Sequence, residues 1–110
     1  MVEEIVPILR VADADAAVAW YERLGFRKEW EHRFDPDCPA FVSVADGPVR
    51  LFLSEHLGDA QPDILVGLVV DDIEAVVTEF GRPAGDQPYG CDFELRDPDG
   101  NRLRISTRAS

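Results

Sequence analysis

The sequence contains two copies of one strand–helix pattern, and this repeat constrains the fold more than any other feature. In the first copy, Asp13 is placed to cap an alanine-rich helix, because its carboxylate can accept free N–H groups of the first turn, and Gly25 ends that helix. In the second copy, Asp72 is the cap and Gly81 the end. The caps are 72 − 13 = 59 residues apart. Because 110 residues suit one domain, we expect a single domain built from a repeat at residues 1–56 and another at residues 62–110.

Each predicted helix has one apolar face, and strand segments surround it. Residues at helical spacing form the two apolar stripes, Ala17, Trp20, Tyr21 and Leu24 in the first copy and Ile73, Val76, Val77 and Phe80 in the second. Strands are expected before the helices at residues 6–11 and 64–70. Turns at residues 46–47 and 97–101 each join two further strands. Each half therefore predicts β-α-β-β-β. One half alone would leave a sheet face exposed, so two halves or two chains must pack together.

Composition excludes several classes of partner. Eleven basic and 22 acidic residues give a formal net charge of −11, which repels nucleic acid and anionic membrane surfaces and attracts cations. No apolar run approaches the length of a membrane span, and the first residues lack the basic region of a signal peptide, so we expect a cytoplasmic protein. Cys38 and Cys91 form no CxxC pair, and we expect both to be reduced.

Three segments carry a resemblance to a known superfamily. Residues 11–26 read VxDxxxAVxWYxxLGF, residues 68–76 read LVVDDIEAV, and residues 88–105 read PYGCDFELRDPDGNRLRI. In this order they resemble the glyoxalase, bleomycin resistance and extradiol dioxygenase superfamily, also called the vicinal-oxygen-chelate superfamily. The resemblance implies an α+β fold of two tandem β-α-β-β-β modules whose curled mixed sheets form a cleft, commonly completed by a dimer. Residues 88–90 and 41–54 are most similar to the bleomycin resistance proteins.

Most enzymes of this superfamily hold a divalent metal at four equivalent strand positions. The resemblance places the first ligand seven residues before each capping aspartate, at Val6 and Leu65, and the other four residues after each hairpin glycine, at Leu51 and Arg104. Three hydrocarbon side chains and a guanidinium offer a dication no lone pair. Neither of the two histidines of the chain falls at these positions. We therefore expect no metal, no other cofactor and no catalytic residue.

The cleft that the resemblance implies should offer aromatic faces and negative charge to a flat ligand with a cationic tail. The candidate ligand-binding residues are Trp30, Phe34, Phe41, Leu51, Tyr89, Phe93 and Arg104. Alternation along the strands favours core packing for Phe41 and Phe52, and it leaves both alternatives open for Trp30 and Tyr89. Acidic groups near these positions are Glu29, Glu31, Asp35, Asp37, Asp92 and Glu94. Residues 33–39 form an insertion relative to the bleomycin binders, which leaves the identity of the ligand open.

These expectations combine into a metal-free, homodimeric protein that captures a small cationic or aromatic molecule stoichiometrically, with an antibiotic of the bleomycin type as the first candidate. One alternative is an enzyme of the same fold, a lyase, isomerase or dioxygenase with an atypical or absent metal site. Another is a regulatory or partner-binding domain with an empty cleft. Elemental analysis distinguishes the enzyme from the binder. A thermal-shift screen of small molecules distinguishes both from the third alternative.

Overall fold

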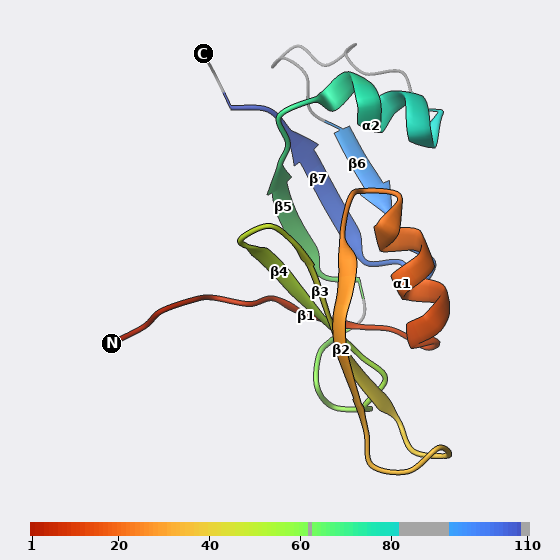
Figure 1. Cartoon of the computed structure of the whole chain (residues 1–110). Helices are drawn as coiled ribbons and strands as arrows, with labels where there is room; N and C mark the ends of the chain where they lie inside the picture. The colour runs from red at the N-terminus through yellow and green to blue at the C-terminus, as the bar shows by residue number, and fades with distance from the viewer. Residues whose placement is uncertain (62, 82–92, 109–110) are drawn as a thin grey trace.

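The structure is a computed structural model that describes residues 1–61, 63–81 and 93–108. Its elements follow the repeat in the sequence (Figure 1) and have these bounds: β1 (Ile8–Arg10), α1 (Ala14–Glu22), β2 (Arg27–Arg33), β3 (Ala40–Asp46), β4 (Val49–Ser54), β5 (Leu65–Val69), α2 (Ile73–Phe80), β6 (Phe93–Arg96) and β7 (Arg102–Ser106). The strand predicted between α2 and β6 lies outside the described residues. Cys91 also lies outside them, and Cys38 is a free thiol.

The strands form two mixed sheets. A four-stranded sheet has the order β1-β4-β3-β2, and a three-stranded sheet has the order β5-β7-β6. In each sheet the strand before the helix pairs in parallel with the last strand of its half, and the other neighbours are antiparallel. This architecture confirms the predicted α+β fold class.

Both helices begin where the sequence predicts. The Asp13 carboxylate accepts hydrogen bonds from the backbone N–H groups of Asp15 and Ala16, and Asp72 accepts one from Ala75. Gly81 ends α2 in the left-handed conformation, with φ 65°, which glycine adopts without steric cost. No helix in the described part of the chain is long and apolar enough to cross a membrane.

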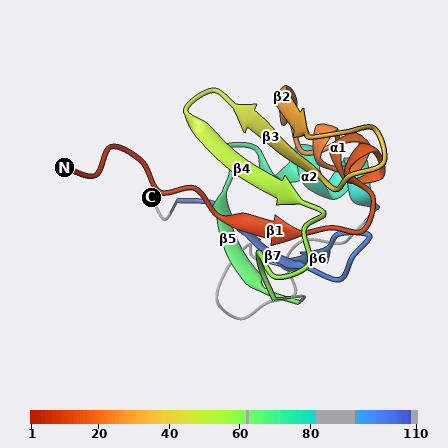
Figure 2. The same cartoon turned by 90° about the horizontal axis from the view of Figure 1, so that it is seen from below.

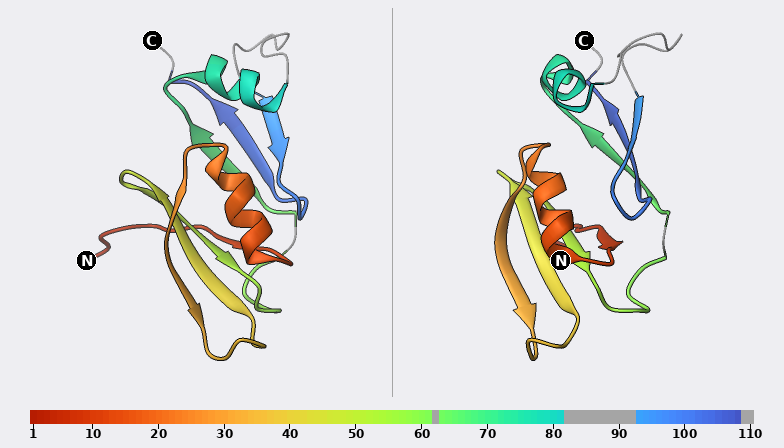
Figure 3. Two further views of the ribbon diagram at one scale, coloured as in Figure 1. Left: turned by 45° about the vertical axis from the view of Figure 1, so that its right-hand side comes forward. Right: turned by 90° about the vertical axis from the view of Figure 1, so that its right-hand side faces the viewer.

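The core forms on one face of each sheet. α1 packs on β2, β3 and β4 and lies along the four-stranded sheet, and α2 lies near one end of the three-stranded sheet (Figure 3). One cluster of buried side chains includes residues from both sheets and both helices: Leu9, Val11, Ala14, Ala17, Tyr21, Phe26, Ala40, Val42, Val44, Leu51, Leu53, Ile73, Val76, Leu95, Leu103 and Ile105. Because side chains alternate along a strand, each sheet also has an opposite face, which we call its open face.

The two halves repeat one backbone hydrogen bond at the end of each parallel strand pair. Val11 N donates to Ser54 O at 2.9 Å, and Val70 N donates to Ser106 O at 2.8 Å. The offset between the donors is 70 − 11 = 59 residues, equal to the offset between the caps. The offset between the acceptors is 106 − 54 = 52 residues, one fewer than the 99 − 46 = 53 between the hairpin turns. Because of this difference of one residue, strand pairing and counting from the hairpin turns give different equivalent positions in the last strands of the two halves.

The hairpin turn of the second half docks on the first half. Asp99 Oδ1 accepts a hydrogen bond from Ala12 N at 2.8 Å, and Asn101 Nδ2 donates to Arg10 O at 2.9 Å. The Tyr21 hydroxyl donates to Asp97 Oδ2 at 2.7 Å, with both side chains buried. The N-terminal segment, in contrast, extends away from the rest of the molecule (Figure 2).

Candidate functional site

Three aromatic rings from three strands gather on the open face of the four-stranded sheet. Trp30 stacks on Phe41 with ring centroids 6.0 Å apart and planes 14° apart. Phe52 is tilted against both, at 5.5 Å from Trp30 and 5.2 Å from Phe41. Trp30 is 44% exposed, and the two phenylalanines are partly buried. We call Trp30, Phe41 and Phe52 the aromatic face; His56 lies beside it, 6.5 Å from Phe41.

A bulge in β2 places a carboxylate beside the aromatic face. The pairing of β2 with β3 shifts between Lys28 and Trp30, so that Glu29 has no partner in the register. Glu29 Oε1 accepts hydrogen bonds from the Ser43 hydroxyl at 2.7 Å and from Arg50 Nε at 2.6 Å. Arg50 Nη2 donates to the other carboxylate oxygen at 2.9 Å.

The same contacts fix the charge state of this carboxylate. Hydrogen bonds from Arg50 and Ser43 lower the pKa of Glu29 to about 2, so it is ionised at neutral pH. Glu4, from the N-terminal segment, adds a second carboxylate on Arg50. This group of two carboxylates and one guanidinium therefore carries one net negative charge at the edge of the aromatic face.

The open face of the three-stranded sheet has the opposite character. Leu103 and Ile105 are buried in the core, so Arg104 between them lies on the open face, as do Arg102 and Arg96 by the same alternation. Leu65 is 41% exposed and Val69 57% exposed on this face. The two open faces thus differ: one is aromatic, and the other carries arginines between aliphatic side chains.

The structure places two of the predicted ligand-binding residues, Leu51 and Phe93, on the core side of their sheets. Leu51 is 1% exposed and belongs to the core. Phe93 pairs in the register with buried Ile105 and packs against the core. Phe52 is the residue of the first half that is equivalent to Arg104 of the second half. Ile8 pairs with Phe52 and Gly67 pairs with Arg104, and Ile8 and Gly67 are 59 residues apart, as the caps are. The count from the hairpin glycine was one residue short, and a one-residue shift moves a side chain to the other face of a sheet.

The remaining predicted residues have different surroundings. Trp30 and Phe41 lie together, although the sequence favoured core packing for Phe41. Phe34 is 87% exposed in the loop after β2 and contacts no ring among the described residues. Arg104 lies on the other sheet, and Tyr89 falls outside the described residues. Phe52, for which the sequence also favoured core packing, lies on the open face between buried Leu51 and Leu53 and packs against Trp30 and Phe41.

The residues at the metal positions do not fit a divalent metal. With the register corrected, these positions hold Val6, Phe52, Leu65 and Arg104, and none of these side chains offers a lone pair to a cation. Among residues 1–61, 63–81 and 93–108, no group of three His, Cys, Asp or Glu side chains is arranged to hold a metal ion.

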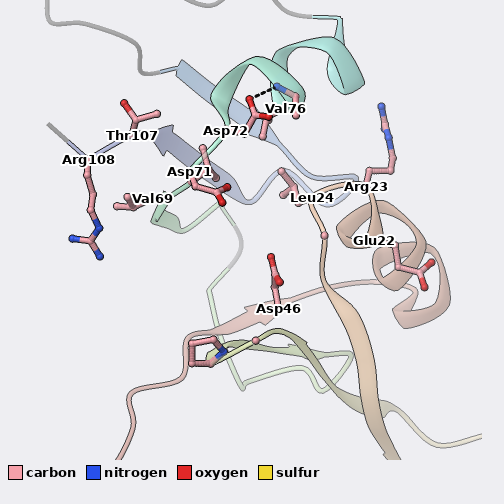
Figure 4. A pocket seen from close by; sticks show the side chains of 15 residues that line it. Glu22, Arg23, Leu24, Asp46, Val69, Asp71, Asp72, Val76, Thr107 and Arg108 are labelled. Atoms are coloured by element: carbon pink, nitrogen blue, oxygen red, sulfur yellow. Dashed lines mark hydrogen bonds between the residues drawn. The ribbon is translucent and has the colours of Figure 1, made fainter. Parts of the chain in front are cut away.

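A groove of about 810 Å³ lies between the two halves (Figure 4). Its lining includes the acids Glu22, Asp46, Asp71 and Asp72 and the bases Arg23 and Arg108, which leaves two net negative charges. The groove has the volume of a small-molecule site, but among the described residues that line it none is aromatic and none belongs to the predicted ligand-binding set. Within the part of the chain that the structure describes, the stacking partners for a flat ring system therefore lie on the aromatic face.

Comparisons with known proteins identify the family. The model of a family described as glyoxalase superfamily protein matches residues 1–110, the whole chain. A search of curated proteins finds no match. Similar solved structures include a bleomycin-binding protein complexed with bleomycin, with a TM-score of 0.72 and 22% identity over 98% of this chain and 100% of that chain.

Two further solved structures show the range of proteins with this fold. TnmS3, an antibiotic binding protein from Streptomyces sp. CB03234, has a TM-score of 0.76 and 20% identity over 99% of both chains. Glyoxalase I of Leishmania major has a TM-score of 0.74 and 22% identity over 97% of this chain and 87% of that chain. At these identities the structures share the fold alone. The full-length family match and the common fold show that this chain belongs to the glyoxalase superfamily.

Proposed function

We propose that this protein binds a small molecule with a flat aromatic part and sequesters it, with an antibiotic of the bleomycin type as the first candidate. The aromatic face carries this proposal. Trp30 is 44% exposed, and its indole ring is held nearly parallel to the ring of Phe41. The outer surface of the indole is therefore fixed in orientation. A fixed aromatic surface stacks on a flat ligand at little cost in conformational entropy.

The charge of the protein supports a ligand with a positive charge. A formal net charge of −11 raises the local concentration of cations, and the ionised Glu29 group adds negative charge beside Trp30. An indole face also attracts a cation directly. Two relatives of the same fold bind bleomycin or another antibiotic, as their descriptions say, and this likeness adds support without identifying the ligand.

Fluorescence titration with metal-free bleomycin tests the proposal. The chain has two tryptophans, so Trp20→Phe leaves Trp30 as the only indole. Trp30→Ala is the matched loss variant, and calorimetry provides a readout independent of the fluorescence of the ligand. We expect binding with a micromolar or lower Kd that Trp30→Ala weakens about thirtyfold, the effect of losing a central tryptophan worth about 2 kcal/mol. No heat and no fluorescence change at micromolar bleomycin would exclude this antibiotic.

We also propose that the protein acts as a single-domain homodimer in the cytoplasm. Val49 and Leu57 remain exposed outside the aromatic face, and a second copy would cover such apolar side chains. Light scattering after size exclusion should then give twice the chain mass of 12.3 kDa. Elemental analysis of the same sample tests the enzyme alternative, since a stoichiometric transition metal would favour it.

A further inference from the structure

We propose that Arg104 binds an oxyanion of the captured molecule, a carboxylate or a phosphate group, on the open face of the three-stranded sheet. This inference rests on the proposed function and adds to it a chemical requirement on the ligand. It differs from the expectation of a purely cationic ligand, because a guanidinium repels a cation and binds an oxyanion.

The position of Arg104 fixes where its guanidinium can go. Leu103 and Ile105 are fully buried on either side, so the side chain of Arg104 must leave the sheet on the open face. The strand is the central one of its sheet, with β5 on one side and β6 on the other. Arg104 therefore stands in the middle of the open face and not at its edge.

Glu94 lies opposite Arg104 in the register of β6 and β7, but among the described residues its ion pairs are with Arg96 and Arg102. Two carboxylates form ion pairs with the other two arginines of this face. Asp63 lies 3.2 Å from Arg96 and 3.5 Å from Arg102, and Glu94 lies 3.8 Å and 3.6 Å from the same two. No hydrogen bond or ion pair joins the Arg104 guanidinium to any residue in the described part of the chain. Counted over the described residues, three arginines and two carboxylates give this group one net positive charge in a protein of net charge −11.

No described residue fills the space at the register partner of Arg104. Its register partner on β5 is Gly67, and a Cβ atom added there would meet nothing within 4 Å. Glycine inside a strand weakens the strand and often marks a place where another molecule approaches closely. The exposed side chains of Leu65 and Val69 flank the glycine on the same strand and would contact the apolar part of a ligand.

An arginine without a partner among the described residues suits an oxyanion. The guanidinium is planar and permanently charged, and its parallel N–H groups match the two oxygens of a carboxylate or phosphate. A hydrogen bond between two charged groups is stronger than one between neutral groups. The loss of this bond should therefore weaken binding by a factor of about ten or more.

The experiment uses benzoate, its neutral analogue benzamide, and inorganic phosphate as probes of the whole protein. Nitrogen-15 spectra report the Arg104 Nε–H signal, which Arg104→Gln identifies by removing it. We expect benzoate to shift this signal with a Kd on the order of 1 mM, as befits a ligand with so few heavy atoms, and benzamide to leave it unchanged. A shift with phosphate but not with benzoate would assign the site to phosphate groups.

Three variants test whether binding depends on the charge of Arg104 and on the space beside it. Arg104→Gln should weaken benzoate or phosphate binding at least tenfold, whereas Arg27→Gln, an equal charge change on exposed β2, should change it less than twofold. Gly67→Val keeps Arg104 and its charge but fills the adjacent space, and it favours strand structure. It should abolish binding while leaving the melting temperature unchanged or higher, which separates blocked access from misfolding.

Several outcomes overturn the inference. Binding that Arg104→Gln leaves unchanged, or benzamide binding as well as benzoate, would show that the charge is not recognised. A drop in dimer mass in Arg104→Gln would assign Arg104 to a contact with a second copy. With bleomycin, stronger binding by Arg104→Gln would indicate a purely cationic ligand. Since bleomycin binding depends on Trp30 and the oxyanion on Arg104, either proposal can fail while the other holds.

Discussion

Replacing Tyr21 by phenylalanine removes one hydroxyl from the contact between the two halves of the chain. Tyr21 is fully buried, and its hydroxyl donates to Asp97 Oδ2 at 2.7 Å. The ring contacts with Trp20 and Phe26, at 4.9 Å and 6.1 Å between centroids, remain in the variant. Tyr21→Phe therefore tests the hydrogen bond with little disturbance of packing.

The loss should be large because the acceptor is a buried carboxylate. A hydrogen bond to a charged group contributes about 1.5–3 kcal/mol. Asn101 Nδ2 still donates to the same oxygen at 3.0 Å, so we expect a value near the lower end. An unfolding entropy of roughly 2.1 cal/mol/K per residue gives about 0.23 kcal/mol/K for this chain, so the melting temperature should fall by roughly 6–9 °C.

Circular dichroism melts and urea titrations of Tyr21→Phe, Asp97→Asn and the double variant measure this effect. If the two groups interact as described, the double-mutant cycle should give a coupling of at least about 1 kcal/mol. A destabilisation below about 0.5 kcal/mol, or additive effects in the cycle, would refute the view that this bond holds the second hairpin on the first half.

Three other predictions concern the pH dependence and the two faces of the first sheet. Burial raises the pKa of Tyr21 far above its ordinary value of about 10, so its stabilisation is present below pH 10 and lost as pH rises further; absorbance at 295 nm should show it ionising only on unfolding. The hydrogen bond from Arg50 helps lower the pKa of Glu29 to about 2, so its contribution is present above pH 4.5 and lost as pH falls toward 2; Arg50→Gln should raise the carbon-13 titration midpoint. In urea unfolding, Leu53→Ala should cost about 2–5 kcal/mol, and Phe52→Ala less than half as much; equal losses would contradict the assignment of the two faces.

The sequence predicted the parts of the fold that depend on local chemistry. The capping aspartates and the glycine at residue 81 act within one turn of a helix, so their roles can be recognised without tertiary information. The apolar stripes were equally visible, and Tyr21 and Val76 of these stripes are buried as predicted. The sequence also required each half to pack against another, because a half with one helix cannot cover its sheet, but it left open whether the other half or a second chain does so.

The site depends on register, and register could be predicted only in part. Counting from the hairpin glycines gave Leu51 as the equivalent of Arg104, but the pairing of β1 with β4 gives Phe52. The bulge at Glu29 adds one residue to β2, and nothing in the local sequence indicates it. The absence of lone pairs at the metal positions was insensitive to this error, because Leu51 and Phe52 are equally unable to ligate a metal.

Along β4 and β7, buried core side chains alternate with side chains on the open faces. Leu53 and Leu103 can therefore stay constant while Phe52 and Arg104 are exchanged. Recognition of a new ligand can then evolve in single substitutions that leave folding almost untouched. Such a scaffold can keep its fold while most of its residues change, as the fold shared with TnmS3 at 20% sequence identity illustrates.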